Sequence, residues 1–183
     1  MIRVSSQITF CSPDTILRRT IVELNDKNIL THLFSLDDGN FELSQTLFFD
    51  GILSQELVSV KQNTGNKEIS SFVNNYNYFD FSESLPTIEL VKTNNPLILD
   101  VGTNSFNRLN SILPYLSKFL NAFSIFEIIA ACTYYPALVS GLTTGLTENK
   151  YTHLMLWENV DLALKKLTSY SQLKEMNSLS SIS

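Results

Sequence analysis

The sequence has few of the residues that build metal sites, disulfide frameworks and linkers. Its 183 residues include two histidines, two cysteines, six glycines and five prolines. Cys11 and Cys132 lie in unrelated segments and belong to no CxxC pair, so we expect two reduced, partly buried thiols. The small number of glycines and prolines excludes a low-complexity linker.

The chain also lacks a long apolar run and a cluster of basic residues. Its longest apolar run, residues 125–131, contains Glu127 and is far too short to span a bilayer. Residues 1–6 lack the apolar region of a signal peptide, which together with the reduced thiols predicts a cytoplasmic location. The net charge is -5 with scattered lysines and arginines, which argues against nucleic acid or an anionic membrane as the main partner.

The apolar content, 44%, is enough for one sizeable core or two small ones. In the first fifty residues, apolar positions alternate with polar ones over residues 2–10, 16–24 and 29–36. This period of two predicts strands, and the Asn and Asp residues at 25–28 predict a hairpin turn between two of them. The N-terminal region is therefore expected to form an antiparallel β layer.

From Leu85 the apolar period becomes helical, and the run at 97–101 is typical of a buried parallel strand flanked by helices. Strand-like character returns over residues 154–167. Strands at both ends therefore enclose an α/β element.

Two further helices are predicted in the second half of the chain. Apolar residues over 109–123 follow the i, i+3, i+4, i+7 pattern, with Ser111 as the expected N-cap and Pro114 in the first turn. Residues 124–127 read Ser-Ile-Phe-Glu, a capping box that opens the second helix. We expect this helix to break before Pro136.

Five segments carry motifs in a recognisable order: Phe-Phe-Asp-Gly-Ile-Leu at 48–53, Leu-Pro at the start of 85–91, Leu-Ile-Leu-Asp-Val-Gly-Thr-Asn-Ser-Phe at 97–106, Ala-Cys-Thr within 128–141, and the Leu, Glu and Lys at 146–150 that precede Leu-Met-Leu. The order resembles the amidohydrolase superfamily, in particular its aminohydrolase branch of deaminases and chlorohydrolases. In that family a small β-sandwich is built from both chain ends, and a metal-binding (β/α)₈ barrel is inserted between them.

The resemblance implies an α+β fold with an unusual division. Residues 1–58 and 146–176 would form the composite β-sandwich, and residues 59–145 a residual fragment of the barrel, followed by a tail at 177–183. A complete barrel needs about 200–250 residues, so the middle strands with their metal ligands are expected to be deleted.

The residues that the family uses for metal binding are replaced. At the family's His-x-His positions the chain has Lys61-Gln-Asn63, and Asn104 takes the place of the strand-8 aspartate. A protonated lysine cannot ligate a metal, and an asparagine cannot accept the proton of a metal-bound water. The resemblance thus implies a vestigial site at Lys61, Asn63 and Asn104, with no metal, no cofactor and no catalytic residue.

Thr103, Asn104 and Ser105 offer a candidate pocket, because α/β folds place ligands at the carboxyl ends of strands. The alternative is a strand-to-helix loop in which these side chains bond the local backbone. Lys61 and Asn63 would likewise lie in an exposed turn.

These observations predict a non-catalytic amidohydrolase-like protein, a pseudoenzyme that acts as a scaffold, binding or regulatory subunit. The alternative is a residual metal-dependent hydrolase or deaminase acting on C–N bonds of a small cyclic substrate. The expected partners are a second copy in a homodimer and, as a further candidate, a full-length amidohydrolase. Neither nucleic acid nor a membrane is an expected partner.

Overall fold

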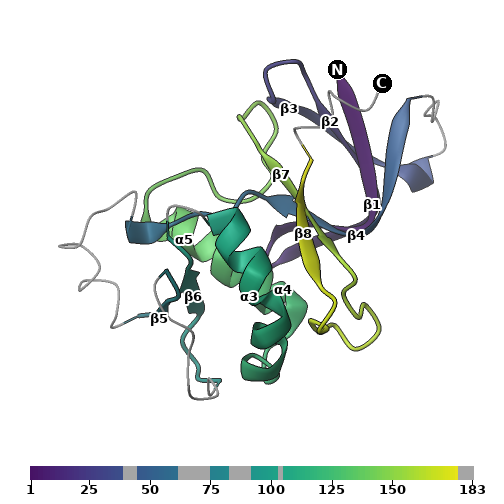
Figure 1. Ribbon diagram of the computed structural model, residues 1–183. Coiled ribbons are helices and arrows are strands. Elements are labelled where there is room, and N and C mark those ends of the chain that lie inside the picture. Colours follow the sequence, from purple (N-terminus) through teal and green to yellow (C-terminus); the bar gives the residue numbers. More distant parts are fainter. Residues whose placement is uncertain (39–44, 62–74, 83–91, 103–104, 177–183) are drawn as a thin grey trace. The chain divides into compact units, whose positions relative to one another are not determined.

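The computed structural model describes residues 1–38, 45–61, 75–82, 92–102 and 105–176 (Figure 1). Their contacts divide them into two compact units. The first unit contains residues 1–56 and 145–158 with the segment that begins at Leu173, and the second contains residues from 57–144 and 159–172.

The first unit is built on a six-stranded sheet in the order β3-β2-β1-β4-β7-β8. β1 pairs antiparallel with β2 and parallel with β4, while β2–β3 and β4–β7 are antiparallel, so the sheet is mixed. The buried core includes Val4, Val22, Leu53 and Leu156. The strands are β1 (Ile2–Ser12), β2 (Thr15–Leu24), β3 (Leu30–Ser35), β4 (Thr46–Gln55), β7 (Leu154–Glu158) and β8 (Gln172–Glu175), and the 3-10 turn η1 (Leu36–Asp38) follows β3.

The turn between β2 and β3 forms as the sequence predicts. Asn25 Oδ1 accepts hydrogen bonds from the backbone N–H groups of Lys27, at 2.9 Å, and Ile29, at 3.0 Å. Asn28 has a φ of 56°, in the left-handed region that asparagine tolerates better than most residues. The side chain of one asparagine and the backbone of another therefore reverse the chain.

Gly51 marks the point at which β4 changes its surroundings. It has a φ of +136°, and a Cβ at this position would lie 2.2 Å from the carbonyl oxygen of Trp157. The register of β4 against β1 shifts here, from Ser6↔Phe49 to Ile8↔Ile52. Residues before the glycine are mainly exposed, and residues 51–55 are buried. Only glycine satisfies both the backbone angle and the close approach.

The second unit contains the parallel pair β5 (Asn77–Asp80) and β6 (Leu97–Asp100). The helices among its described residues are α3 (Ser105–Phe119), α4 (Ile125–Cys132) and α5 (Tyr134–Val139). α4 and α5 contact β6, and every residue of β6 is buried, as expected for an apolar parallel strand.

The capping box at the start of α4 is confirmed. The Ser124 hydroxyl accepts the Glu127 N–H at 3.3 Å, and Glu127 Oε2 accepts the Ser124 N–H at 2.8 Å. The predicted break before Pro136 is also confirmed, because α4 ends at Cys132 and Pro136 lies in the first turn of α5.

The predicted start of the preceding helix is wrong. α3 begins at Ser105, so Pro114 lies inside the helix and Ser111 is not its N-cap. The Ser111 hydroxyl instead donates to the carbonyl of Arg108 at 2.7 Å. The strand-like character predicted beyond Glu158 is absent over residues 159–167, which form turns and one isolated bridge. The predicted helix at 85–91 lies outside the described residues.

The predicted fold class, a composite β-sandwich with a residual (β/α)₈ barrel fragment, is wrong. In the described part of the chain both ends contribute to one six-stranded mixed sheet, and β5 and β6 form a separate two-stranded sheet with helices packed on it. A buried apolar strand followed by a helix is common to many α/β arrangements. The pattern over residues 97–119 therefore predicts that the strand is buried, but it does not predict that the sheet closes into a barrel. The predicted division into residues 1–58 with 146–176, residues 59–145 and a tail at 177–183 remains a prediction.

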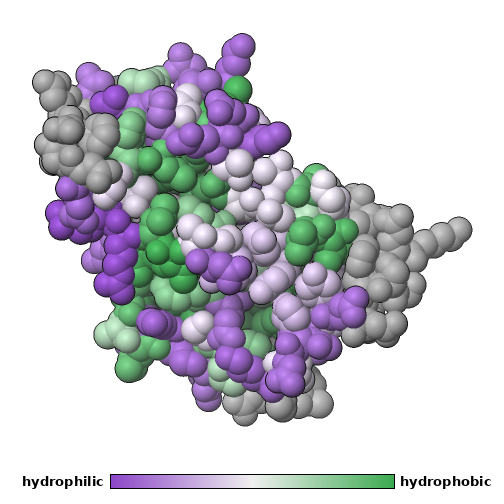
Figure 2. Space-filling view, turned by 180° about the vertical axis from the view of Figure 1, so that it is seen from behind, coloured by the Kyte–Doolittle hydropathy of each residue, from purple (hydrophilic) through white to green (hydrophobic). Residues whose placement is uncertain are grey.

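Some large hydrophobic side chains stay exposed, among them Leu47 and Phe48 of β4 and Leu138 of α5. Hydrophobic residues reach the surface between hydrophilic ones on the face shown in Figure 2. Within the described ranges, no helix has both the length and the apolar character needed to cross a bilayer.

Candidate functional site

The carboxylate of Asp100, at the end of β6, accepts four hydrogen bonds from described residues of the second unit. It is completely buried, at 0% exposure. Oδ1 accepts hydrogen bonds from the Ser59 hydroxyl at 2.8 Å and the Gly102 N–H at 3.0 Å. Oδ2 accepts from the Lys61 N–H and the Tyr78 hydroxyl, each at 2.9 Å. Asp100 therefore joins the segment at 57–61, β5 and the turn after β6.

The surroundings of Asp100 keep the Tyr78 phenol and the Cys132 thiol protonated. Burial and the Asp100 charge raise the pKa of the Tyr78 hydroxyl far above its ordinary value, so the phenol stays a hydrogen-bond donor. Burial, with a smaller contribution from Asp100, likewise raises the pKa of the Cys132 thiol. Because the thiolate is the nucleophilic form, this cysteine is not activated.

Lys61, predicted to be a vestigial site position in an exposed turn, is engaged at both its backbone and its side chain. Its ammonium forms an ion pair with Asp80, and the two side chains are 34% and 30% exposed. Asp80 Oδ1 also accepts hydrogen bonds from the N–H and hydroxyl of Ser82, at 2.9 and 2.6 Å. Burial would raise the pKa of Asp80, but the bonds from Lys61 and Ser82 outweigh it and the pKa is lowered.

Of the other predicted positions, only Ser105 lies among the described residues. Asn63, Thr103 and Asn104 lie outside the described residues, and Ser105 is the first residue of α3. The candidate pocket at 103–105 therefore remains a prediction. Among the described residues, no group of three or more His, Cys, Asp and Glu side chains is placed to hold a metal ion.

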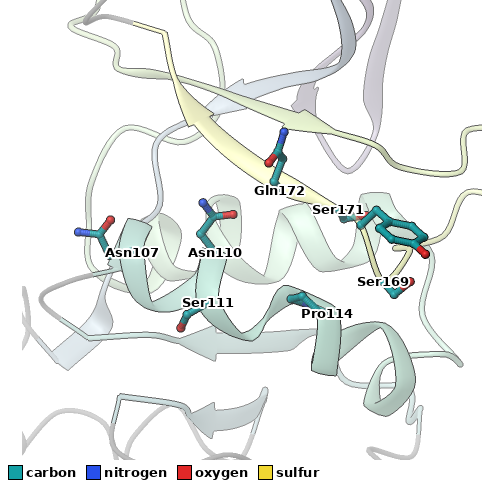
Figure 3. Close-up of a pocket in the computed structure, with 8 residues that line it drawn as sticks. Asn107, Asn110, Ser111, Pro114, Ser169, Ser171 and Gln172 are labelled. Carbon is teal, nitrogen blue, oxygen red and sulfur yellow. The ribbon is translucent and has the colours of Figure 1, made fainter.

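A different site, which sequence reasoning did not predict, lies between α3 and the segment at 169–172 (Figure 3). It is a surface hollow of about 490 Å³. One wall is a single face of α3, and Asn110 on this helix extends toward Gln172 on the opposite segment (Figure 3). The lining residues are Asn107, Asn110, Ser111, Pro114, Ser169, Tyr170, Ser171 and Gln172.

The segment opposite α3 is held in place by its own hydrogen bonds. Ser171 is buried, and its hydroxyl accepts the Thr168 N–H at 2.9 Å and donates to the carbonyl of Asn159 at 3.0 Å. The Thr168 hydroxyl also donates to Asn159, at 2.7 Å, and accepts the Tyr170 N–H at 3.1 Å. These bonds fix the turn at 168–171, while the Tyr170 side chain remains exposed.

Further contacts attach this segment to the helical part of the unit. The Ile125 N–H donates to the Lys165 carbonyl at 2.7 Å, and Lys166 Nζ donates to the Phe123 carbonyl at 2.9 Å. The connection between α3 and α4 is thereby tied to the segment that forms the other wall of the hollow.

The sequence indicates the α3 wall of this hollow but not the opposite wall. Asn107, Asn110, Ser111 and Pro114 follow an i, i+3, i+4, i+7 spacing, which places them on one helix face. A polar face opposite an apolar stripe is normally only a solvated surface. The spacing gives no indication that residues 169–172 lie against that face.

Comparison of the chain with protein-family models and with curated proteins gives no match. The resemblance to amidohydrolases therefore remains a prediction from the motifs themselves. Of the most specific motif, at 97–106, residues 97–100 form β6, and Asp100 and Gly102 belong to the hydrogen-bonded cluster described above.

Proposed function

We propose that this chain is a non-catalytic protein that acts by binding. The observation that carries the proposal is the saturation of Asp100, whose two oxygens accept four hydrogen bonds from Ser59, Lys61, Tyr78 and Gly102. A general base needs a lone pair within reach of a substrate proton. Here both oxygens are directed at the protein's own donors, and the residue is buried.

The neighbouring groups support the same interpretation. The Lys61 ammonium is paired with Asp80, and the pKa of the Cys132 thiol is raised by burial. A lysine nucleophile must be able to lose its proton, whereas an ion pair with a carboxylate stabilises the protonated form. These side chains thus hold the 57–61 segment on the β5–β6 pair. The hollow beside α3 is an open polar surface among the described residues of the same unit.

The relation to amidohydrolases is a separate proposal, supported only by the motifs at 48–53, 85–91, 97–106, 128–141 and 146–156. A pseudoenzyme origin would explain why Lys61, Asn63 and Asn104 stand at the ligand positions. The binding role does not depend on this origin.

Elemental analysis of the purified chain, combined with an assay for hydrolysis or deamination of cyclic C–N substrates, tests the proposal. We expect no stoichiometric zinc, iron or manganese, and no turnover with or without added zinc. Close to one transition metal per chain, together with turnover that a chelator abolishes, would contradict the proposal. An Asp100→Asn variant supplies the control, because a contaminating enzyme would leave the turnover of wild type and variant equal.

A further inference from the structure

The chemistry of the hollow beside α3 restricts its ligand. None of the eight lining residues is charged. Charged ligands such as phosphates or carboxylates are normally held by Arg or Lys, and apolar ligands require a predominantly apolar wall. The lining instead combines the amide groups of Asn107, Asn110 and Gln172 with the Ser169 hydroxyl. The Ser111 and Ser171 hydroxyls donate to the carbonyls of Arg108 and Asn159. An amide offers two donor hydrogens and an acceptor oxygen on one side chain. Hydroxyl groups, which both donate and accept, match such a surface.

An aromatic ring stands at the edge of this polar surface. Tyr170 is 81% exposed, an unusual state for a large aromatic side chain. The hydrogen bonds from Thr168 and Ser171 to Asn159 hold the turn that carries the ring. The backbone under the ring is thus fixed before any ligand arrives, which reduces the entropic cost of binding.

From this combination we propose that the hollow binds a neutral oligosaccharide. A sugar ring presents hydroxyl groups at its rim and C–H groups on its faces. The amides of Asn107 and Asn110 would bond the hydroxyl groups, and the Tyr170 ring would stack on a C–H face. A volume of about 490 Å³ on an open surface suits more than one sugar unit. This inference rests on the proposed binding function and names its ligand class.

Titration calorimetry with three neutral tetrasaccharides, cellotetraose, chitotetraose and maltotetraose, tests the inference. A sulfated, heparin-derived tetrasaccharide serves as the charged comparison. We expect at least one neutral tetrasaccharide to bind at millimolar or lower concentration. Tyr170→Ala should weaken this binding about five- to tenfold, while Tyr170→Phe, which keeps the ring, should weaken it much less.

Tyr115→Ala is the matched control, because Tyr115 is an exposed tyrosine of α3 (54% exposed) that does not line the hollow. Its affinity should equal that of the wild type. Binding of the sulfated sugar alone, binding of none of the three neutral sugars, or binding that Tyr170→Ala leaves unchanged would overturn the inference. The proposed non-catalytic function is tested separately. If the chain bound a neutral sugar and also cleaved it, the proposed ligand class would be correct and the proposed non-catalytic function would be wrong.

Discussion

The phenolic hydroxyl of Tyr78 lies 2.9 Å from Oδ2 of Asp100 and donates a hydrogen bond to it. The two residues belong to neighbouring parallel strands, in which Tyr78 is paired with Ile98 and Asp80 with Asp100. The side-chain bond therefore reinforces a sheet of which two strands lie among the described residues, with few ladder hydrogen bonds between them. The buried carboxylate uses this bond and three others to organise the surrounding backbone.

Removal of the Asp100 carboxylate should destabilise the chain strongly. Asp100→Ala leaves the donors of Ser59, Lys61, Tyr78 and Gly102 without their acceptor, and we expect a loss of about 3–5 kcal/mol in the free energy of unfolding. Tyr78→Phe removes one bond of the four and should cost about 1–2 kcal/mol. Urea unfolding followed by circular dichroism measures both changes.

Asp37→Ala is the control for these two variants. Asp37 pairs with Arg19 on the surface and should contribute almost nothing to the free energy of unfolding. If Asp100→Ala destabilised the chain no more than this control, the structural role assigned to Asp100 would be wrong.

The Lys61–Asp80 ion pair predicts a pH-dependent difference between wild type and a Lys61→Met variant. The pKa of Asp80 is lowered in the folded state from its ordinary value of 3.8. The contribution of the ionised Asp80 to the free energy of unfolding is therefore fully present above the pKa of the unfolded state. It is lost as the pH falls through the pKa of the folded state. Both side chains are about one-third exposed, so Lys61→Met should cost only about 0.5–1 kcal/mol at pH 7. Unfolding curves from pH 7 to pH 2 should show the two proteins converging in the acid range.

Lys27→Met, at an exposed turn position, should show no such pH-dependent difference. A Lys61→Met deficit that persists unchanged at pH 2 would mean that the lysine stabilises the fold through packing of its stem and not through its charge.

Local signals in the sequence account for the elements that were predicted correctly. The capping box of Ser124 and Glu127 and the turn of Asn25 and Asn28 are each complete within four or five residues, so spacing alone reveals them. Pro114 shows the limit of this approach. A proline suggests a helix start, but α3 continues across it and begins at Ser105.

The candidate sites could not be predicted because their parts are distant in the chain. Ser59 and Asp100 are separated by 41 positions, and no period or motif connects them. The same holds for Asn110 and Gln172, on opposite walls of the hollow. The barrel interpretation failed for a related reason: the apolar pattern at 97–101 reports that a strand is buried, whereas the closure of a sheet depends on partners elsewhere in the chain.

Both cysteine thiols should resist modification in the folded chain. Cys11 and Cys132 are free and buried, and burial raises the pKa of Cys11 to about 11 and that of Cys132 further. At pH 8 both are therefore protonated as well as inaccessible. We expect iodoacetamide to add no group to the native chain and two groups in guanidinium chloride, as measured by intact mass. Rapid alkylation of either thiol in the native chain would contradict its buried position.

The last prediction concerns self-association through β4. The pairing of β4 with β7 covers only Ile52–Gln55, so residues 46–49 are paired on the β1 side alone among the described residues. Leu47 and Phe48 in this stretch are 44% and 57% exposed. Neighbouring strand residues point to opposite faces, so apolar surface flanks the strand edge on both sides. An unpaired edge of this kind is a template for another strand, and two copies can pair their edges about a two-fold axis.

We therefore expect a homodimer, with a light-scattering mass of about twice 20.7 kDa at micromolar concentration. Phe48→Lys places a charge at the edge and should return the mass to that of one chain. Leu138→Lys, the same change in charge at an exposed position of α5, should leave the dimer intact because it does not alter the edge of β4. A mass of 20.7 kDa at every concentration would rule the dimer out. A dimer that Leu138→Lys disrupts and Phe48→Lys does not would assign the contact to α5, since each substitution introduces the same charge and only its position differs.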